Sequence, residues 1–339
     1  MITRLATAAD VARLAGVSPA TVSRAFNAPA LLDPQTLERV RQAAARLEYR
    51  PHGVARSLRS RRSLIIGVLI PSLQNTYFAE TVERVQALLA ERGYTVVIAS
   101  SHYDPEAEHA AVRAMTRQGV DAVLLVGRPL DDRTRGLLQQ FGIPGLRCWV
   151  WMDEPPCVGF DHDAALRQVA VHLLSLGHRR FALVVPFIAL RDRLRSRQSA
   201  IRDALADAGV ALPAAAVVDD QGFGLPGGRA ALQELTRRGE VPTAVVCSND
   251  LIAAGVILQA RAQGLRVPVD LSVTGYNDLD LASAFEPPIT TVATPMAEHA
   301  SRVVDALMAL LEGEMPAPDG PLVTQLVVRG STGPAPGRS

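Results

Sequence analysis

The stretch TAADVARLAGVSPATVSRAF, which spans residues 7–26, decides how the N-terminal part of the chain folds. Thr7 and Asp10 have the spacing of a capping box, in which each side chain bonds the other residue's backbone N–H, so a helix is predicted to begin here. Gly16 is predicted to end this helix, because glycine enters the left-handed conformation without steric cost. Apolar residues recur at i, i+3 and i+4 and predict one apolar face: Val11, Leu14 and Ala15.

A second helix is predicted to follow at once, with Ser18 as its N-cap and Pro19 at its first helical position. We expect it to bury Val22 and Phe26. Small and basic residues are then left facing outward: Ala20, Thr21, Ser23 and Arg24. A short helix, a tight glycine turn and a second helix with such residues at its N-terminal end are typical of a helix-turn-helix that enters the major groove of DNA.

Two further features favour this interpretation over a helical domain of another kind. A third amphipathic helix is predicted to begin with Asp33 as its cap and Pro34 at its first position, and its apolar face consists of Leu37, Val40, Ala44 and Leu47. The charge is also segregated, because residues 1–62 hold 11 Arg and 4 acidic residues, a net charge of +7, while the rest of the chain has a net charge of −6. A basic head supplies the attraction to phosphates that DNA binding needs.

The runs DVARLAGVSPATVSRAFN (residues 10–27) and YRPHGVARSLRS (residues 49–60) resemble the lactose-repressor (LacI/GalR) family of bacterial transcription regulators. The resemblance extends over nearly the whole chain. It implies a cytoplasmic homodimer that binds double-stranded operator DNA, a pseudo-palindrome, under the control of a small-molecule effector.

The resemblance implies a helix-turn-helix DNA-binding domain at residues 1–50 and a hinge at residues 51–62. In the family this hinge forms a helix on operator DNA, paired with the same helix of a second subunit, and without DNA it is expected to be a flexible linker. Leu58 matches the apolar wedge that enters the minor groove and kinks the duplex, and Arg59 lies beside it.

The family match also places Pro19 and Ala20 at base-reading positions. Neither side chain can donate a hydrogen bond, so direct readout there would be apolar, with thymine methyl groups as contacts. Arg24 and Arg56 are expected to contact bases or phosphates, and the hydroxyl side chains to hold phosphates. The full set of expected DNA-binding residues is Thr7, Ser18, Pro19, Ala20, Thr21, Ser23, Arg24, Asn27, Arg56, Leu58 and Arg59.

From Leu64 onward, buried strands alternate with amphipathic helices, which predicts two doubly wound parallel sheets. The fold class is therefore an all-α helix-turn-helix head plus an α/β core, and the resemblance implies that this core is two-lobed and periplasmic-binding-protein-like. It divides residues 63–330 into a first lobe at about 63–161 and 292–321 and a second lobe at about 162–291 and 322–330. The Pro/Gly-rich residues 331–339 are expected to form a disordered tail.

Ligands of such sheets bind beyond the carboxyl ends of the strands, so the effector site is expected in the cleft between the lobes. Several residues leave those strand ends or match family positions at the cleft. The expected effector-binding residues are Asn75, Tyr77, Phe78, Arg147, Trp149, Asp161, Arg195, Phe223, Asn249 and Asn277.

The charge of these residues bears on the kind of effector. Asn277 stands where the family usually has an aspartate that binds effector hydroxyls, and Arg147 and Arg195 add positive charge. A guanidinium binds a carboxylate in bidentate fashion. Together with VGFD and TTVATP, which resemble the gluconate-repressor branch, these residues predict a sugar acid or another hydroxy acid rather than a neutral sugar. A solvated surface charge is the alternative for Arg147.

No motif of the sequence supports catalysis, since GxSxG and HExxH are both missing. The glycine-rich Gly222–Gly228 lacks the Lys-Ser/Thr of a phosphate-binding loop. Asp161, His162 and Asp163 have no second cluster with ligand spacing, and the 3 cysteines are expected to be reduced thiols. We therefore expect a protein that is not an enzyme and that needs no metal and no cofactor.

Alternatives come from other classes of protein. A solute-binding protein shares the body fold, but the N-terminus lacks a secretory signal and the head is basic. A nicotinamide-dependent enzyme is opposed by the first strand-to-helix turn, PSLQNTY, which lacks the glycines that a pyrophosphate needs. No apolar run is long enough to span a membrane. Activation or repression, induction or co-repression, and dimer or tetramer stay open.

Overall fold

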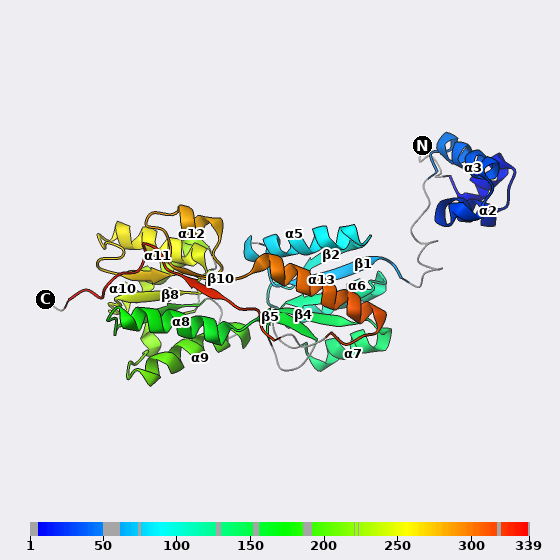
Figure 1. Ribbon diagram of the computed structural model, residues 1–339. Coiled ribbons are helices and arrows are strands. Elements are labelled where there is room, and N and C mark those ends of the chain that lie inside the picture. Colours follow the sequence, from blue (N-terminus) through cyan, green and yellow to red (C-terminus); the bar gives the residue numbers. More distant parts are fainter. Residues whose placement is uncertain are drawn as a thin grey trace. The chain divides into compact units, whose positions relative to one another are not determined.

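The structure is a computed structural model of the 339-residue chain. It describes residues 6–49, 62–73, 76–126, 130–151, 156–185, 192–219, 221–222, 224–316 and 320–337, without the side chains of Asn27 and of residues 192–198. The chain divides into two compact units, a head at residues 1–64 and a body at residues 65–339 (Figure 1).

The described part of the head is helical, and its caps follow the sequence signals. The elements are α1 (Ala8–Ala15), α2 (Pro19–Asn27), the 3-10 helix η1 (Pro29–Leu31) and α3 (Pro34–Arg46). The Thr7 hydroxyl accepts the Asp10 N–H at 3.3 Å, and the Asp10 carboxylate accepts the Thr7 N–H at 3.0 Å, which is the predicted capping box. Gly16 ends α1 with a left-handed φ of 65°.

The core of the head differs from the prediction at one position. Leu14 was expected on the apolar face of α1, but it is 49% exposed, whereas Ala12 is buried. The reason is that α2 and α3 both pack against α1, so the buried face is centred on Val11, Ala12 and Ala15. Phe26 is half-buried and its ring lies edge-on to Tyr49, 5.9 Å between centroids.

The first lobe of the body contains a five-stranded parallel sheet in the order β2-β1-β3-β4-β5. Its strands are β1 (Ile65–Ile70), β2 (Thr95–Ser100), β3 (Ala122–Val126), β4 (Gly145–Val150) and β5 (Cys157–Phe160). The helices of this lobe are α5 (Thr76–Glu91), α6 (Pro105–Arg117), α7 (Asp132–Phe141) and α13 (Met296–Glu312). Helix α5 packs beside α13, and α6 packs beside α7. The alternation of strands and helices confirms the predicted doubly wound sheet.

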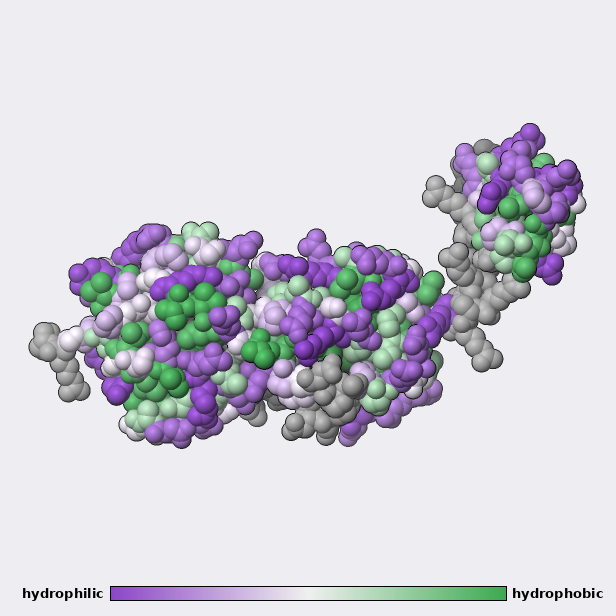
Figure 2. All heavy atoms as spheres, viewed as in Figure 1, coloured by the Kyte–Doolittle hydropathy of each residue, from purple (hydrophilic) through white to green (hydrophobic). Residues whose placement is uncertain are grey.

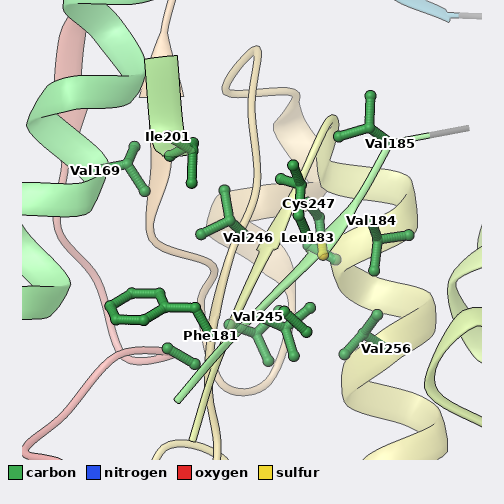
Figure 3. Close-up of a cluster of buried hydrophobic side chains, with 14 of the residues drawn as sticks. Val169, Phe181, Leu183, Val184, Val185, Ile201, Val245, Val246, Cys247 and Val256 are labelled. Carbon is green, nitrogen blue, oxygen red and sulfur yellow. The ribbon is translucent and has the colours of Figure 1, made fainter. Parts of the chain in front are cut away.

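The second lobe contains a parallel sheet in the order β7-β6-β8-β9. Its elements are α8 (His162–Ser175), β6 (Phe181–Val184), α9 (Asp192–Asp207), η3 (Ala214–Ala216), β7 (Val217–Val218), α10 (Leu225–Arg237), β8 (Ala244–Cys247), α11 (Asp250–Ala262), β9 (Ser272–Thr274) and α12 (Asp280–Ala284). Figure 3 shows its core, where Val245 and Val246 of β8 lie among side chains from β6 and the surrounding helices. This second parallel sheet completes the predicted fold class.

The chain crosses between the two lobes at three places. The first crossing runs from β5 to α8, and the second runs from β10 (Thr291–Ala293) to α13. The third runs from Leu322, which pairs with Phe160, to β11 (Gln325–Val327), which is antiparallel to β10. Each lobe is therefore built from segments that are far apart in the sequence.

The prediction of a disordered tail at residues 331–339 is wrong for residues 331–337. Ser331 is fully buried, its hydroxyl accepts the Thr290 N–H at 2.8 Å, and it donates to the Val273 carbonyl at 2.6 Å. Gly333 N–H donates to Ser272 Oγ at 3.1 Å. Proline and glycine composition misled the prediction, because this segment is held by hydrogen bonds to the edge of the second sheet rather than by apolar packing.

Polar and apolar residues are interspersed on the face of the molecule seen in Figure 2. Among the helices of the described ranges, none is long and apolar enough to cross a membrane. The exposed apolar side chains are scattered over several elements, as Phe141, Val171 and Val269 illustrate. Scattered exposure of this kind is normal for a folded protein.

We expect Ser331→Ala to lower the free energy of unfolding of the body by about 1–3 kcal/mol, because it leaves the buried Thr290 N–H and one acceptor of the Val273 carbonyl without the hydroxyl. Urea unfolding followed by circular dichroism measures this. Ser175→Ala is the control, since the Ser175 hydroxyl is exposed and, within the described part of the chain, bonds its own helix through the His172 carbonyl. Equal midpoints for the two variants would contradict the assigned role of the tail.

Candidate DNA interface and effector site

The N-terminal end of α2 is the exposed part of the helix-turn-helix. Ser18 caps the helix by accepting the Thr21 N–H at 3.1 Å, and the two hydroxyl oxygens lie 2.9 Å apart. Pro19 and Ala20 are exposed, while Val22 is buried against α1 and α3. The helix therefore presents a surface of small side chains.

The charges around α2 favour an anionic partner. The first turn of α2 holds no acidic residue, and Arg24 is exposed in its last turn. A helix N-terminus carries partial positive charge and exposed N–H groups, which suit phosphate oxygens. Ser23 is half-buried, and Thr7, although exposed, bonds Asp10 within α1. The predicted DNA contacts Arg56, Leu58 and Arg59, and the side chain of Asn27, lie outside the described residues.

Two of the predicted effector-binding residues, Phe78 and Trp149, lie together in the first lobe. Their rings are edge-on with centroids 5.8 Å apart, and both side chains are only 1% exposed. Tyr77 is beside Phe78, 5.9 Å between centroids. The indole Nε1 of Trp149 is buried and has no hydrogen-bond partner among the described residues. A buried donor without a partner is rare in folded proteins, so this N–H is a candidate ligand contact.

Trp149 has an unusual backbone that His299 of α13 helps to hold. Its φ of 71° is left-handed, a conformation that non-glycine residues seldom adopt. The Trp149 N–H lies 3.3 Å from His299 Nε2, and the two rings are 5.2 Å apart. Burial lowers the pKa of His299 to about 4, so the imidazole is neutral at neutral pH. With Nε2 unprotonated it accepts the Trp149 N–H, and in the other tautomer Nε2 donates to the Val158 carbonyl oxygen, also 3.3 Å away. The strained residue thus lies at the predicted effector site, where such strain tends to concentrate.

Asn277 lies at the end of the second sheet, in a loop with unusual backbone angles. Its φ is 103° and that of Asp278 is 56°, and both are left-handed. The Asn277 N–H donates to the Val292 carbonyl of the crossing strand β10 at 2.9 Å. Asp278 is paired with Arg329 at 2.7 Å. Asn277 is therefore held where the second lobe meets a crossing strand.

Asp161 and Asn249 take part in helix capping. The Asp161 carboxylate accepts the N–H groups of Asp163 and Ala164 at 3.0 and 2.9 Å, at the start of α8. The Asn249 side-chain oxygen accepts the Ile252 N–H at 2.8 Å, at the start of α11. Both residues were expected to bind an effector. Capping gives each of them a structural role that the sequence alone does not separate from ligand binding.

Arg147 is two residues before Trp149 in β4, and it lines a pocket. This pocket, of about 450 Å³ in the first lobe, is also lined by Arg135 and Leu138 of α7 and by Met315 beyond α13. Among the described residues of this pocket, Arg147 is the only predicted effector residue. Asn75, Phe223 and the side chain of Arg195 lie outside the described residues.

Asp250, which sequence analysis missed, holds the loop of the second lobe that carries Asn277. The carboxylate is fully buried, accepts the Leu279 N–H at 2.8 Å, and lies 2.5 Å from the Thr291 hydroxyl. An added Cβ at Gly275 would overlap its Oδ1. Burial raises the pKa of Asp250 to about 7. The only sequence signal is the pair Asn249–Asp250 directly after the buried strand β8.

His162 and Tyr276 were also missed, and they join the two lobes. His162 Nδ1 lies 2.7 Å from the Tyr276 hydroxyl, and Nε2 lies 2.9 Å from the Trp149 carbonyl oxygen. Both side chains are buried. No group of three or more His, Cys, Asp or Glu side chains in the described ranges has the geometry to hold a metal ion.

Known proteins share both units of the chain. Residues 7–52 match the family "Bacterial regulatory proteins, lacI family", and residues 170–332 match the "Periplasmic binding protein-like domain". The HTH-type transcriptional regulator GntR of Pseudomonas aeruginosa is 33% identical over 90% of this chain and 89% of its own length. The ribose operon repressor of Haemophilus influenzae is 31% identical over 90% of this chain and 91% of its own length. A crystal structure of the lac repressor dimer bound to operator and the anti-inducer ONPF has a TM-score of 0.84 and 29% identity, and the match covers 97% of this chain and 100% of that one.

A helix-turn-helix head followed by a body with two parallel sheets defines a DNA-binding transcriptional regulator that a ligand controls. The coverage of the GntR relative leaves no large part of the chain unmatched. The chain belongs to the lacI family of bacterial regulatory proteins.

The raised pKa of Asp250 predicts a pH dependence of stability. Because the pKa in the folded chain, about 7, is above the ordinary 3.8, the folded state keeps a proton between these values that the unfolded state has released. The bound proton therefore contributes to the free energy of unfolding. This stabilisation is fully present below pH 3.8 and is lost as the pH rises through about 7. We expect the free energy of unfolding of the wild type to fall by a few kcal/mol relative to that of Asp250→Asn between pH 4 and 7. Urea unfolding at each pH measures this.

Asp270→Asn is the control for this experiment. Arg266 lowers the pKa of the half-buried Asp270 to about 2, so this carboxylate stays ionised from pH 4 to 7. The free energies of unfolding of the wild type and of Asp270→Asn should therefore change in parallel with pH over that interval. Parallel curves for the wild type and Asp250→Asn would show that the Asp250 proton is not linked to folding.

Proposed function

We propose that the chain is a homodimeric repressor whose affinity for a pseudo-palindromic operator is set by a small effector bound between the two lobes. The observation that carries the proposal is the N-terminal end of α2. Ser18, Pro19 and Ala20 are exposed there, and no acidic residue of the first turn would repel phosphates. Such an end fits a major groove with its backbone N–H groups toward the DNA.

The proposed base readout is mostly apolar. Pro19 and Ala20 offer no donor to a base edge, so thymine methyl groups are their proposed contacts. Arg24 contacts a base or a phosphate, and the hydroxyls of Ser18 and Thr21 position the head on the phosphates. The hinge residues Leu58 and Arg59, placed by the family match alone, enter the minor groove at the centre of the operator.

The proposed dimer gives each half of the operator one head. A second subunit is needed because the hinge acts in pairs and because a pseudo-palindrome mirrors the twofold symmetry of its protein. The solved lac repressor dimer bound to operator supports this assembly. We assign the contact to α5 and to the segment that follows β10. The edge strand β2 lies next to α5, and its Ile98, which is 38% exposed, offers an apolar side chain beside this proposed contact.

The proposed effector is a sugar or a sugar acid. The Trp149 indole N–H and the Asn277 side chain supply a donor and an amide on opposite lobes, which suits a polyhydroxylated ligand. The preference for an acid rests on the uncharged Asn277 and on Arg195, because Arg147 lines a separate pocket. The GntR relative supports this preference. The proposal assigns the chain no catalytic step, no metal and no cofactor.

Selection of duplexes from a random pool by the full-length chain, followed by sequencing, tests the DNA-binding part of the proposal. We expect a palindrome with a C·G/G·C step at its centre, because the paired hinges kink the duplex there. Leu58→Ala is expected to keep the half-sites and lose the preference for the central step. Salt-sensitive binding without any enriched sequence would contradict the proposed operator recognition.

Calorimetry with D-gluconate and D-glucose tests the effector class. We expect heat of binding with D-gluconate, and about tenfold weaker binding for Asn277→Asp, because a carboxylate at this position repels the acid and a tenfold change needs only about 1.4 kcal/mol. Arg147→Gln should leave the affinity unchanged, since Arg147 lines another pocket. Binding of D-glucose alone would exclude an acidic effector and favour a neutral sugar.

A further inference from the structure

One buried side chain makes hydrogen bonds to both lobes. His162 is the first residue of α8, at the crossing from β5, and it is 6% exposed. Its Nδ1 lies 2.7 Å from the hydroxyl of Tyr276 at the end of the second sheet. Its Nε2 lies 2.9 Å from the carbonyl oxygen of Trp149 in β4 of the first sheet. The imidazole therefore spans the boundary between the lobes.

The partners determine where the protons are. A carbonyl oxygen only accepts, so His162 Nε2 carries the hydrogen of the bond to Trp149. In the neutral ring, Nδ1 then accepts the hydroxyl hydrogen of Tyr276. Both ring nitrogens are thus used, one on each lobe. A change that moves the lobes apart at this point must break at least one bond in a buried place, where an unsatisfied polar group is unfavourable.

The bridge connects two of the predicted effector-binding residues. On the first lobe it holds the backbone of Trp149 itself, whose N–H is held by His299 at 3.3 Å. On the second lobe it holds Tyr276, the residue directly before Asn277. The loop that begins there is fixed by the Asp250 carboxylate through the Leu279 N–H at 2.8 Å. A ligand that contacts Trp149 and Asn277 therefore acts on residues at both ends of the bridge.

We propose that His162 is a positioning residue that couples the two lobes and transmits effector occupancy from the cleft to the arrangement of the lobes. This inference rests on the proposed effector site. Ligand contacts that shift Trp149 relative to Asn277 lengthen or shorten the two bonds of His162 together. The lobes then respond as a pair, which is what control of two heads from one ligand site requires.

A comparison with the buried His178 shows why the position of His162 is distinct. His178 is fully buried, and both ring nitrogens are hydrogen-bonded. Nδ1 lies 3.0 Å from the Thr243 hydroxyl, and Nε2 lies 3.0 Å from the Ser272 hydroxyl and 3.1 Å from the Gly333 carbonyl oxygen. All of these residues belong to the second lobe. His178 thus matches His162 in residue type, burial and bonding, but not in joining two lobes, so it supplies a matched control.

Hydrogen–deuterium exchange of the full chain, without DNA or effector, is the first test. His162→Phe keeps a ring in the same place and removes both bonds. We expect about tenfold faster exchange in peptides of both lobes, around residues 145–151 and 276–284. Tyr276→Phe, which removes one oxygen, should give a smaller change in the same two regions. His178→Phe should accelerate exchange in the second lobe alone.

The exchange pattern decides the proposal. Faster exchange confined to one lobe in both His162→Phe and Tyr276→Phe would overturn it and leave His162 a local structural residue. If His162→Phe does not fold, Tyr276→Phe still decides, because it changes a single hydroxyl.

The second test measures the coupling directly. Operator affinity is titrated with and without D-gluconate, and the ratio of the two affinities is compared between variants. We expect the ratio of His162→Phe to fall toward 1 while His178→Phe keeps that of the wild type. An unchanged ratio in His162→Phe would overturn the proposed transmission. A wild type that does not respond to D-gluconate would instead count against the proposed effector class, and the exchange experiment would still decide the coupling.

Discussion

The buried carboxylate of Asp250 is the interaction on which the loop of Asn277 and the crossing strand β10 depend. It holds the Leu279 N–H on one side and the Thr291 hydroxyl on the other, so one residue fixes both the loop that carries Asn277 and the crossing strand β10. Removing a carboxyl from water is unfavourable, and the pKa of about 7 reflects this. The cost of burying this carboxyl is offset because it accepts hydrogen bonds from the Leu279 N–H and the Thr291 hydroxyl, which would otherwise be buried without partners. The loop and the crossing strand are therefore fixed together.

How far the sequence predicts the molecule depends on how local the signals are. The helices of the head are almost entirely predictable from hydrogen bonds between residues three apart, since Thr7, Ser18 and Asp33 cap the helices that begin after them. Leu14 departs from the prediction because burial on a three-helix core depends on where the partner helices pack, and that is not a local property. The order of the strands and the ordered residues 331–337 depend on pairings between distant segments, such as Ser331 with Thr290. Composition cannot reveal these pairings.

The effector site is harder to predict because single residue types serve two purposes. Asp161 and Asn249 follow strands and precede helices, and at such positions an oxygen can cap a helix or bind a ligand. Arg147 lines the pocket beside α7, and its contact with an effector stays a prediction. The residues that hold the site together, Asp250 and His162, carry no motif. They become visible only when the lengths of their hydrogen bonds to distant segments are known.

In the proposed function, the end of α2 makes few hydrogen bonds to bases. This explains why a ligand bound in the body can control DNA binding effectively. A head that reads bases through Pro19 and Ala20 makes few directional bonds, so one head alone holds its half-site weakly. Tight binding then requires both heads and the hinge at once, and the gain from the second head depends on how well the spacing matches the DNA. A small change in the arrangement of the lobes is therefore multiplied at the operator. Stronger base contacts in each head would make the regulator less sensitive to its effector.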